Sequence, residues 1–342
     1  MNQTNRSCDV QGDRNAALQA PTRIDVHAHF IPSFYRAALI EAGHENPDGM
    51  PYLPDWNDGQ HLESMDRLGI STAILSVSSP GVHFGDDAKA RALSRRINEE
   101  GKRLCEAHRG RFGFFASVPL PDVEGAVKEA AFALDELKAD GIVVETNHHG
   151  VYLGDPRLEP FYAELNRRSA VVFVHPTSPS CHCCQRGDER YPRPMLEFMF
   201  ETTRSITDMV LSGVPVRYPD IRFIVPHAGA ALSVLTERIE MFRPLLQAGT
   251  GTVPSMREAM RRLHFDVAGA PVPTLLSALL QVADPAHIHY GSDYPFTPAP
   301  VCEALLAQID QTDVLDAFGR GGIYQDNSLR LFPRFSGKIK PR

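Results

Sequence analysis

The chain has 342 residues, of which 43% are hydrophobic and 23% are charged, and its formal net charge is -7. This hydrophobicity argues against intrinsic disorder, and the absence of a basic excess argues against nucleic acid as a partner. No run of about 18 apolar residues occurs, so the sequence predicts no membrane span. The length suits two average domains or one α/β barrel.

The terminal segments differ in composition from the rest of the chain. The first 22 residues are polar and contain no apolar stretch of the kind found in secretory signals. We expect residues 1–22 to form a flexible tail and residues 336–342 to form a short basic tail. Six cysteines in a chain of this length do not make a disulfide framework. These features predict a cytoplasmic protein.

Short apolar runs, rich in β-branched and aromatic residues, recur along the chain. The eight runs cover residues 23–29, 71–78, 111–120, 141–146, 170–176, 221–227, 263–269 and 287–293. Their near-continuous apolarity is typical of strands that are buried on both faces of a parallel sheet.

Amphipathic stretches with helical periodicity fill most of the intervals between these runs. The predicted helices cover residues 88–108, 123–138, 158–168, 195–212, 231–242, 253–262 and 274–282. Eight strand–helix units predict a (β/α)8 TIM barrel, formed by residues 23–335 as a single domain. A doubly wound open sheet is the alternative, but no glycine-rich phosphate turn follows the first run.

Two connections are too long for ordinary strand-to-helix loops. Residues 30–60 follow the first strand and contain Trp56, the only tryptophan, and residues 177–194 follow the fifth strand. Loops of this length are usually lids or insertions. Because both follow strands, we expect both to lie over the active-site face of the barrel.

Residue types that bind metals stand at the ends of several predicted strands. His27 and His29 end the first strand, and the fifth, sixth and eighth strands end in His175, His227 and Asp293. Residues i and i+2 of a strand point the same way, so both histidines of the first strand can face the barrel interior. Imidazole nitrogens and a carboxylate oxygen suit Zn²⁺ or another divalent metal. Such a site acts as a Lewis acid or activates a water.

A single His-x-His motif is weak evidence, because many histidines are only core or surface residues. The metal-site interpretation depends on several strand ends that coincide on the face where barrel enzymes carry out chemistry. The remaining histidines are expected to include structural ones, among them His148, His149, His182, His287 and His289. The Cys181–Cys184 run lacks a second ligand pair, so we interpret it as loop thiols or pocket lining rather than a second metal site.

Four motifs resemble the amidohydrolase superfamily. They are HAHF at 27–30, VFVHPT at 172–177, VPHAGAAL at 225–232 and YGSDYPF at 290–296. Within it, the chain is similar to the non-oxidative decarboxylases related to aminocarboxymuconate semialdehyde decarboxylase, over residues 23–335. Segments 65–83, 146–168 and 175–181 are most similar to methylsalicylate-type decarboxylases. The resemblance implies a carboxy-lyase that releases CO2 from a salicylate-like aromatic acid without an organic cofactor.

The resemblance also implies roles for particular residues. His27, His29, His175 and Asp293 would bind one divalent metal, with zinc favoured by the His-x-His motif and manganese as the alternative. Asp293 would pass a proton to the ring, and His227 would transfer a proton beside the open metal position. Arg238 matches an arginine that reaches a substrate carboxylate, often across a dimer interface; otherwise it is a surface charge. A homodimer or homotetramer is therefore expected.

The substrate and two other function classes stay open. Phe296 and Trp56 are candidates to bound the substrate ring. Residues 37–66 lack the arginine that muconate-type enzymes use, which favours a flatter aromatic acid. Hydrolysis of a lactone or amide is the enzymatic alternative, although Glu145 and Thr146, not a lysine, end the fourth strand. A catalytically inactive binding protein on the same barrel is the third interpretation.

Overall fold

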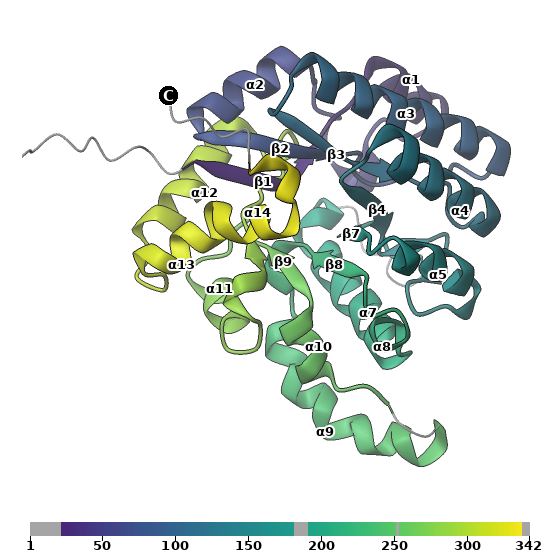
Figure 1. The fold of residues 1–342 in the computed structure, drawn as a ribbon, viewed down its shortest axis with the longest axis vertical. Coiled ribbons are helices and arrows are strands. Elements are labelled where there is room, and N and C mark those ends of the chain that lie inside the picture. Colours follow the sequence, from purple (N-terminus) through teal and green to yellow (C-terminus); the bar gives the residue numbers. More distant parts are fainter. Residues whose placement is uncertain (1–21, 181–190, 251–252, 337–342) are drawn as a thin grey trace, which may run out of the picture.

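Eight parallel strands form one sheet that closes into a barrel with helices around it (Figure 1). The computed structural model describes residues 22–180, 191–250 and 253–336, with the side chains of 248–250 excepted. The strands follow the order β1-β2-β3-β4-β7-β8-β9-β10, and bridges from Asp25 to Tyr290 and from Ala28 to Tyr294 join the last segment to the first. The predicted (β/α)8 barrel is confirmed. The Cys181–Cys184 run and nearly all of both predicted tails lie outside the described residues.

The barrel strands begin close to the predicted positions. They are β1 Arg23–His29, β2 Ile70–Ser76, β3 Phe112–Ser117, β4 Gly141–Glu145, β7 Val171–His175, β8 Arg222–Val225, β9 His264–Asp266 and β10 Ile288–His289. A separate antiparallel pair comprises β5 (Asn147–His148) and β6 (Val151–Tyr152). Several strands end earlier than predicted, because the residues that follow leave the sheet. His227 and Asp293 have φ values of 55° and 60°, which extended backbone does not adopt.

Helices connect successive strands. They are α1 Ser33–Glu41, α2 Asp58–Arg67, α3 Asp87–Ala107, α4 Val123–Phe132, α5 Glu159–Arg167, α7 Glu197–Leu211, α8 Val214–Arg217, α9 Leu232–Thr250, α10 Met256–Arg262, α11 Thr274–Leu279, α12 Ala299–Gln311, α13 Ala317–Gly321 and α14 Asn327–Leu331. Asn57, Asp86 and Asp122 cap α2, α3 and α4 through side-chain oxygens that accept from backbone N–H groups.

The long connection after β1 is an insertion with secondary structure of its own. It contains α1, whose Tyr35 and Leu39 are buried, and a short 3-10 turn at Pro47–Gly49. Pro32 stands at the start of α1, where a proline is tolerated, and the other prolines of this segment follow the helix. Helix α9 extends beyond its predicted end at Phe242 and contains Pro244.

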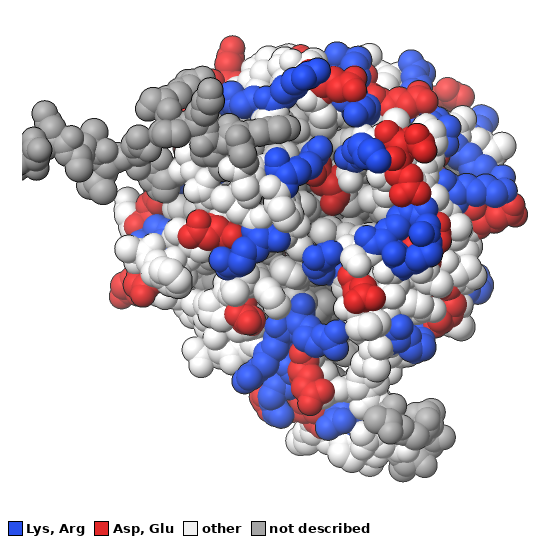
Figure 2. Space-filling view, in the orientation of Figure 1, with Lys and Arg blue, Asp and Glu red and all other residues white. Residues whose placement is uncertain are grey.

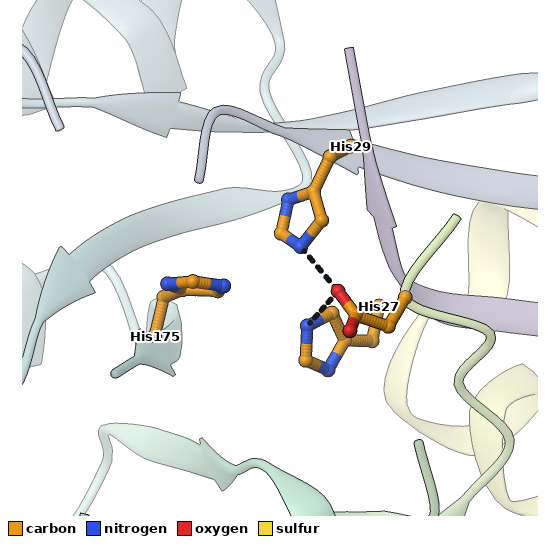
Figure 3. A group of neighbouring side chains, drawn as sticks. His27, His29 and His175 are labelled. Carbon is orange, nitrogen blue, oxygen red and sulfur yellow. Dashed lines mark hydrogen bonds and ion pairs between the residues drawn. The ribbon is translucent and has the colours of Figure 1, made fainter. Parts of the chain in front are cut away.

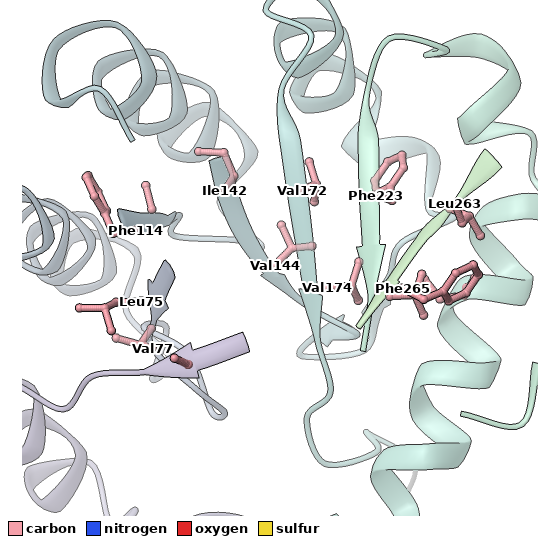
Figure 4. Close-up of a cluster of buried hydrophobic side chains, with 14 of the residues drawn as sticks. Leu75, Val77, Phe114, Ile142, Val144, Val172, Val174, Phe223, Leu263 and Phe265 are labelled. Carbon is pink, nitrogen blue, oxygen red and sulfur yellow. The ribbon is translucent and has the colours of Figure 1, made fainter. Parts of the chain in front are cut away.

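The hydrophobic core has two layers. The larger layer lies between the strands and the surrounding helices; Figure 4 shows part of it, including Leu75, Phe114, Val144, Val174 and Phe265. The second fills the barrel interior and includes residues of the C-terminal segment: Ile24, Val26, Ile74, Phe115, Val143, Val171, Phe173, Ile224, Leu331, Phe332 and Phe335. Each such side chain contributes about 1.5–3 kcal/mol when fully buried. The packed interior fixes the strand ends that carry the candidate site.

The surface charge is mixed in sign. Figure 2 shows Lys and Arg side chains interspersed with Asp and Glu on the face that it draws. Such mixing produces no large field of one sign on this face. Among the described residues, there is no helix with the length and apolarity needed to cross a membrane.

Candidate metal centre

The four predicted ligands lie together at the carboxyl ends of the strands (Figure 3). Each of His27, His29, His175 and Asp293 offers one ligand atom, and these atoms all lie within 4.8 Å of one another. The first two belong to β1, the third ends β7, and the aspartate follows β10. The three histidines are buried, whereas the aspartate side chain is 21% exposed. The structure therefore brings together residues from the first, fifth and eighth barrel strands.

The position of Asp293 is fixed by both its backbone and its side chain. Its N–H donates to the carbonyl oxygen of His27 at 2.7 Å, across the junction between the first and last barrel segments. Oδ1 lies 3.1 Å from His29 Nε2 and 3.5 Å from His27 Nε2. Oδ2 accepts a hydrogen bond from the Thr297 hydroxyl at 3.2 Å. One carboxylate oxygen thus points into the histidine group and the other points toward the cavity side chains.

Asp266, at the end of β9, holds His27 in place. Its Oδ2 lies 2.9 Å from His27 Nδ1, and its Oδ1 accepts backbone N–H groups of His227 and Ala268 at 3.0 and 2.9 Å. Asp266 has no role in the predictions from the sequence, although it lies in the middle of the seventh predicted strand, residues 263–269. Acceptors of this kind fix the tautomer of a metal-binding histidine.

The group fits a divalent cation. His27 Nε2 is buried and has no hydrogen-bond partner within the described part of the chain. A buried polar atom without a partner is costly unless a further group binds it. Three imidazoles and a carboxylate are also the donors that a catalytic zinc-type site uses. The roles of these four residues as ligands stay predictions, and their geometry supports them.

The pKa values separate His27 from the other histidines. Burial disfavours the imidazolium form of His27, but the charge of Asp266 and its hydrogen bond outweigh burial and raise the pKa to about 9. Burial lowers the pKa of His29, His175 and His227 to about 4. Neutral imidazoles offer lone pairs to a cation or a substrate proton. Although burial acts to raise the pKa of Asp293, the nearby histidines hold it below its usual range.

A cavity of about 360 Å³ lies over the candidate ligands. Asp293, His227, Ser78, Asp48 and Thr297 supply polar groups to its wall. The remaining wall is largely apolar and includes Met50, Pro194, Met195, Phe198, Met199, Leu275 and Phe296. A mostly apolar pocket with a few convergent polar groups is typical of a small-molecule site.

The remaining predicted site residues divide into two groups. His227 and Phe296 line this cavity, with ring centroids 5.2 Å from His27 and 5.5 Å from His29 respectively. Trp56 is not among the lining residues; its indole N–H donates to His61 Nδ1 at 2.9 Å. Arg238 lies on α9, outside this cavity, where its guanidinium stacks 5.2 Å from the Phe242 ring. Within one chain, the structure therefore does not bring Trp56 or Arg238 into the cavity.

A parallel barrel with histidine and aspartate donors at its carboxyl ends defines the class of this protein. The family model described as amidohydrolase matches residues 24–334, and the chain belongs to this family.

Within the family, the relatives point to aromatic acid decarboxylases. A 6-methylsalicylic acid decarboxylase of Penicillium expansum is 36% identical, over 92% of this chain and 97% of its own length. The crystal structure of an amidohydrolase II is 37% identical with a TM-score of 0.86, covering 91% of this chain and 99% of its own. A dihydroxybenzoic acid decarboxylase of Polaromonas sp., with bound manganese and 2-nitroresorcinol, shares the fold: 22% identity, a TM-score of 0.79, and coverage of 92% and 97%.

The predicted decarboxylase branch of the amidohydrolases is confirmed, and so is the carboxy-lyase class. The relatives give no support to the alternative of a lactone or amide hydrolase.

Proposed function

We propose that the chain is a metal-dependent, non-oxidative decarboxylase that releases CO2 from an ortho-hydroxybenzoate such as 6-methylsalicylate. One observation carries this proposal: three histidines and Asp293 converge beneath a largely apolar cavity of about 360 Å³. The 36% identity to a 6-methylsalicylic acid decarboxylase supports the choice of substrate class.

The reaction requires a proton at the ring carbon that bears the carboxylate. The bond from this carbon to the carboxylate then breaks, its electron pair returns to the ring, and CO2 leaves. A divalent cation on the four ligands would supply positive charge that binds and orients the carboxylate and phenolic oxygens. Zinc suits the His-x-His ligands, and manganese is the alternative because the Polaromonas enzyme holds it.

The residues of this chain have separable tasks in that reaction. Asp293 keeps one oxygen among the histidines, and its Oδ2 is placed to accept the phenolic proton of the substrate and pass it to the ring carbon. His227 lines the cavity with its buried Nδ1 unpaired within the described residues, which suits a hydrogen bond to the phenolic oxygen. Phe296 and the apolar wall confine the ring and exclude water.

We further propose that Arg238 acts in a homodimer or homotetramer, where it meets the substrate carboxylate in the partner subunit. It lines a groove of about 590 Å³ between α7 and α9, together with the half-exposed Phe200, Phe242 and Leu246. An exposed apolar groove of this kind is typical of an association surface. Sedimentation velocity of the parent protein and of Arg238→Ala tests the association. The KM for the acid, measured on the same two proteins, tests the contact of Arg238 with the substrate carboxylate. The cytoplasmic location and a ring contact from Trp56 stay predictions.

A substrate panel with detection of CO2 tests the proposed function. We expect CO2 from salicylates with an apolar group at position six, and none from the matching 2-methoxybenzoates, which lack the phenolic proton. Metal removal should abolish turnover, and added Zn²⁺ or Mn²⁺ should restore it. Full activity in a verified metal-free preparation, or turnover confined to a parallel panel of lactones and amides, would contradict the proposal.

A further inference from the structure

A second cavity, of about 290 Å³, lies beside the candidate metal centre but includes none of its four ligands in its wall. Glu145, Asn147, His148 and Thr177 contribute polar groups to this cavity. Glu145 ends β4 and is paired in register with His175, which ends β7. The proposed reaction assigns no task to this buried carboxyl group.

Glu145 and His175 each have a polar atom that lacks a hydrogen-bond partner. Within the described part of the chain, neither Glu145 Oε2 nor His175 Nδ1 has one, and both atoms are buried. The two atoms are 3.5 Å apart, and the side chains are 7% and 3% exposed. A hydrogen bond of this type is formed at about 2.7–3.2 Å, so a movement of a few tenths of an ångström would close it. Glu145 Oε2 can therefore accept the hydrogen bond that His175 Nδ1 can donate.

The other two candidate histidine ligands each have a hydrogen-bond acceptor at Nδ1, which His175 lacks within the described residues. Nδ1 of His27 lies 2.9 Å from Asp266 Oδ2, and Nδ1 of His29 lies 3.3 Å from the carbonyl oxygen of Ser76. Each ring thus has an acceptor at Nδ1 and directs Nε2 toward Asp293. In Figure 3, one ring nitrogen of His175 points toward His29 and the other points away. Glu145 places a carboxyl oxygen on the side that points away.

The surroundings of Glu145 confine its side chain. Gly81, in the loop after β2, has a φ of +76°, and a Cβ there would lie 3.2 Å from Glu145 Oε1 and 3.4 Å from its Cγ. The Tyr35 hydroxyl donates to the carbonyl oxygen of Gly81 at 2.8 Å and holds this loop in place. The carboxyl group is therefore positioned before any ligand binds.

We infer that Glu145 is a positioning residue for the metal centre: it accepts the Nδ1–H of His175, fixes the ring with Nε2 toward the other ligands, and strengthens that histidine as a ligand. The inference rests on the proposed function only for the presence of a metal. Carboxylate–histidine pairs act in this way because they fix the tautomer and raise the basicity of the ligand.

The test is the affinity for Zn²⁺ of the full chain, measured by chelator competition without substrate. We expect Glu145→Leu to raise the Kd about 10–100-fold. Glu145→Gln should raise the Kd by a smaller factor, because its amide oxygen can still accept a hydrogen bond from His175 Nδ1. Val143→Ala is the matched control, since Val143 lies on the same strand and lines the same cavity; its Kd should stay within about threefold of the parent. A parent-like Kd in both Glu145 variants overturns the inference.

A double-mutant cycle separates positioning from a general structural role. In a His175→Ala background, Glu145→Leu should cause no further loss of affinity, whereas in a His29→Ala background the loss should persist. Equal losses in the two backgrounds would show that Glu145 does not act through His175. If Glu145→Leu does not fold by circular dichroism, Glu145→Gln carries the same cycle. A protein that shows this coupling but releases no CO2 would refute the proposed function and leave this inference standing.

Discussion

Two of the histidine groups in the described part of the chain differ in their arrangement, and the first of them is arranged to hold a cation. The first group is the candidate centre, where Asp266 and Asp293 lie among the rings. The second comprises His264 at the start of β9, with His287 and His289 at β10. The hydrogen bonds of the described residues link this second group to itself, to Ser328 and to a backbone carbonyl, and not to a carboxylate.

The difference lies in what occupies the ring nitrogens. His264 Nδ1 lies 2.9 Å from His289 Nε2, and His289 Nδ1 lies 2.9 Å from the Ser328 hydroxyl, so these nitrogens are already paired. Burial lowers the pKa of His264 to about 3 and that of His289 well below its ordinary value. In the candidate centre, Asp266 holds His27 from one side, and the other ring nitrogen points toward Asp293 without a hydrogen-bond partner among the described residues. Between these two groups, the carboxylates and not the number of histidines therefore distinguish the candidate centre.

The largest effect is expected from removing the carboxylate that serves both as ligand and as proton carrier. Asp293→Asn should lower kcat at least about 10³-fold, because general acid catalysis and ligand charge are lost together. The melting temperature should change little, since asparagine tolerates the φ of 60° at this position. His289→Gln, in the second group, is the control and should keep kcat within about twofold of the parent. A tenth or more of the parent kcat in metal-loaded Asp293→Asn would rule out its proton-transfer role.

A smaller effect is expected from neutralising the carboxylate behind His27. Asp266→Asn should weaken metal binding about 10–100-fold, because the amide provides no charge to orient and polarise the imidazole. Zn²⁺ affinity is the measurement, and excess metal should restore much of the lost activity. Asp284→Asn, at the turn before β10, is a carboxylate control that should leave affinity unchanged. If Asp266→Asn and Asp284→Asn bind Zn²⁺ equally well, the carboxylate behind His27 does not distinguish the candidate centre from the second group of histidines.

The smallest effect is expected in the free energy of unfolding at acid pH, from the titration of His264 in the second group. The pKa of His264 falls from 6.5 to about 3 on folding, so between these values the unfolded chain binds a proton that the folded chain does not. The free energy of unfolding should therefore fall as pH falls through this window, by at most about 1.4 kcal/mol per pH unit for one histidine. Above pH 6.5 this contribution is fully present.

Urea denaturation of the metal-free protein from pH 7 to pH 4 measures this dependence, with His264→Phe as the comparison. The variant should show a shallower fall with acid, although it loses about 1–3 kcal/mol at pH 7 because His289 loses its partner. Titration of the candidate centre contributes equally to both proteins and cancels in the difference. Parallel curves for the two proteins would mean that His264 does not titrate as its burial requires.

The fold and the clustering of the four candidate ligands could be predicted because both follow from local patterns. Apolar runs gave the strands, and a closed parallel barrel brings the strand ends together, so His29, His175 and Asp293 had to meet. The carboxyl groups of Glu145, near the end of a predicted strand, and of Asp266, in the middle of another, were visible in the sequence. Their partners depend on register and side-chain direction, which local sequence does not specify.

Trp56 and Arg238 show a different limit of sequence reasoning. The hydrogen bond from Trp56 to His61 joins the segment before α2 to α2 itself, and tertiary packing decides whether the indole faces this contact or the cavity. Arg238 could be placed on a helix from periodicity, but its distance from the cavity of its own chain depends on how α9 packs. Neither the direction of the Trp56 indole nor the distance of Arg238 from the cavity can be inferred from the spacing of residues in the sequence.

The junction between β1 and the segment after β10 has a consequence for protein abundance. His27 and His29 stand on one side of this junction and Asp293 on the other, and backbone hydrogen bonds of 2.7 Å, from Asp293 to His27 and from His29 to Tyr294, cross it. A cation on these side chains would bind only the closed ring. By mass action, a free metal concentration 1,000 times the Kd would add about 4 kcal/mol to the stability of the folded state. The amount of this protein that survives in a metal-starved cell would then fall together with its activity.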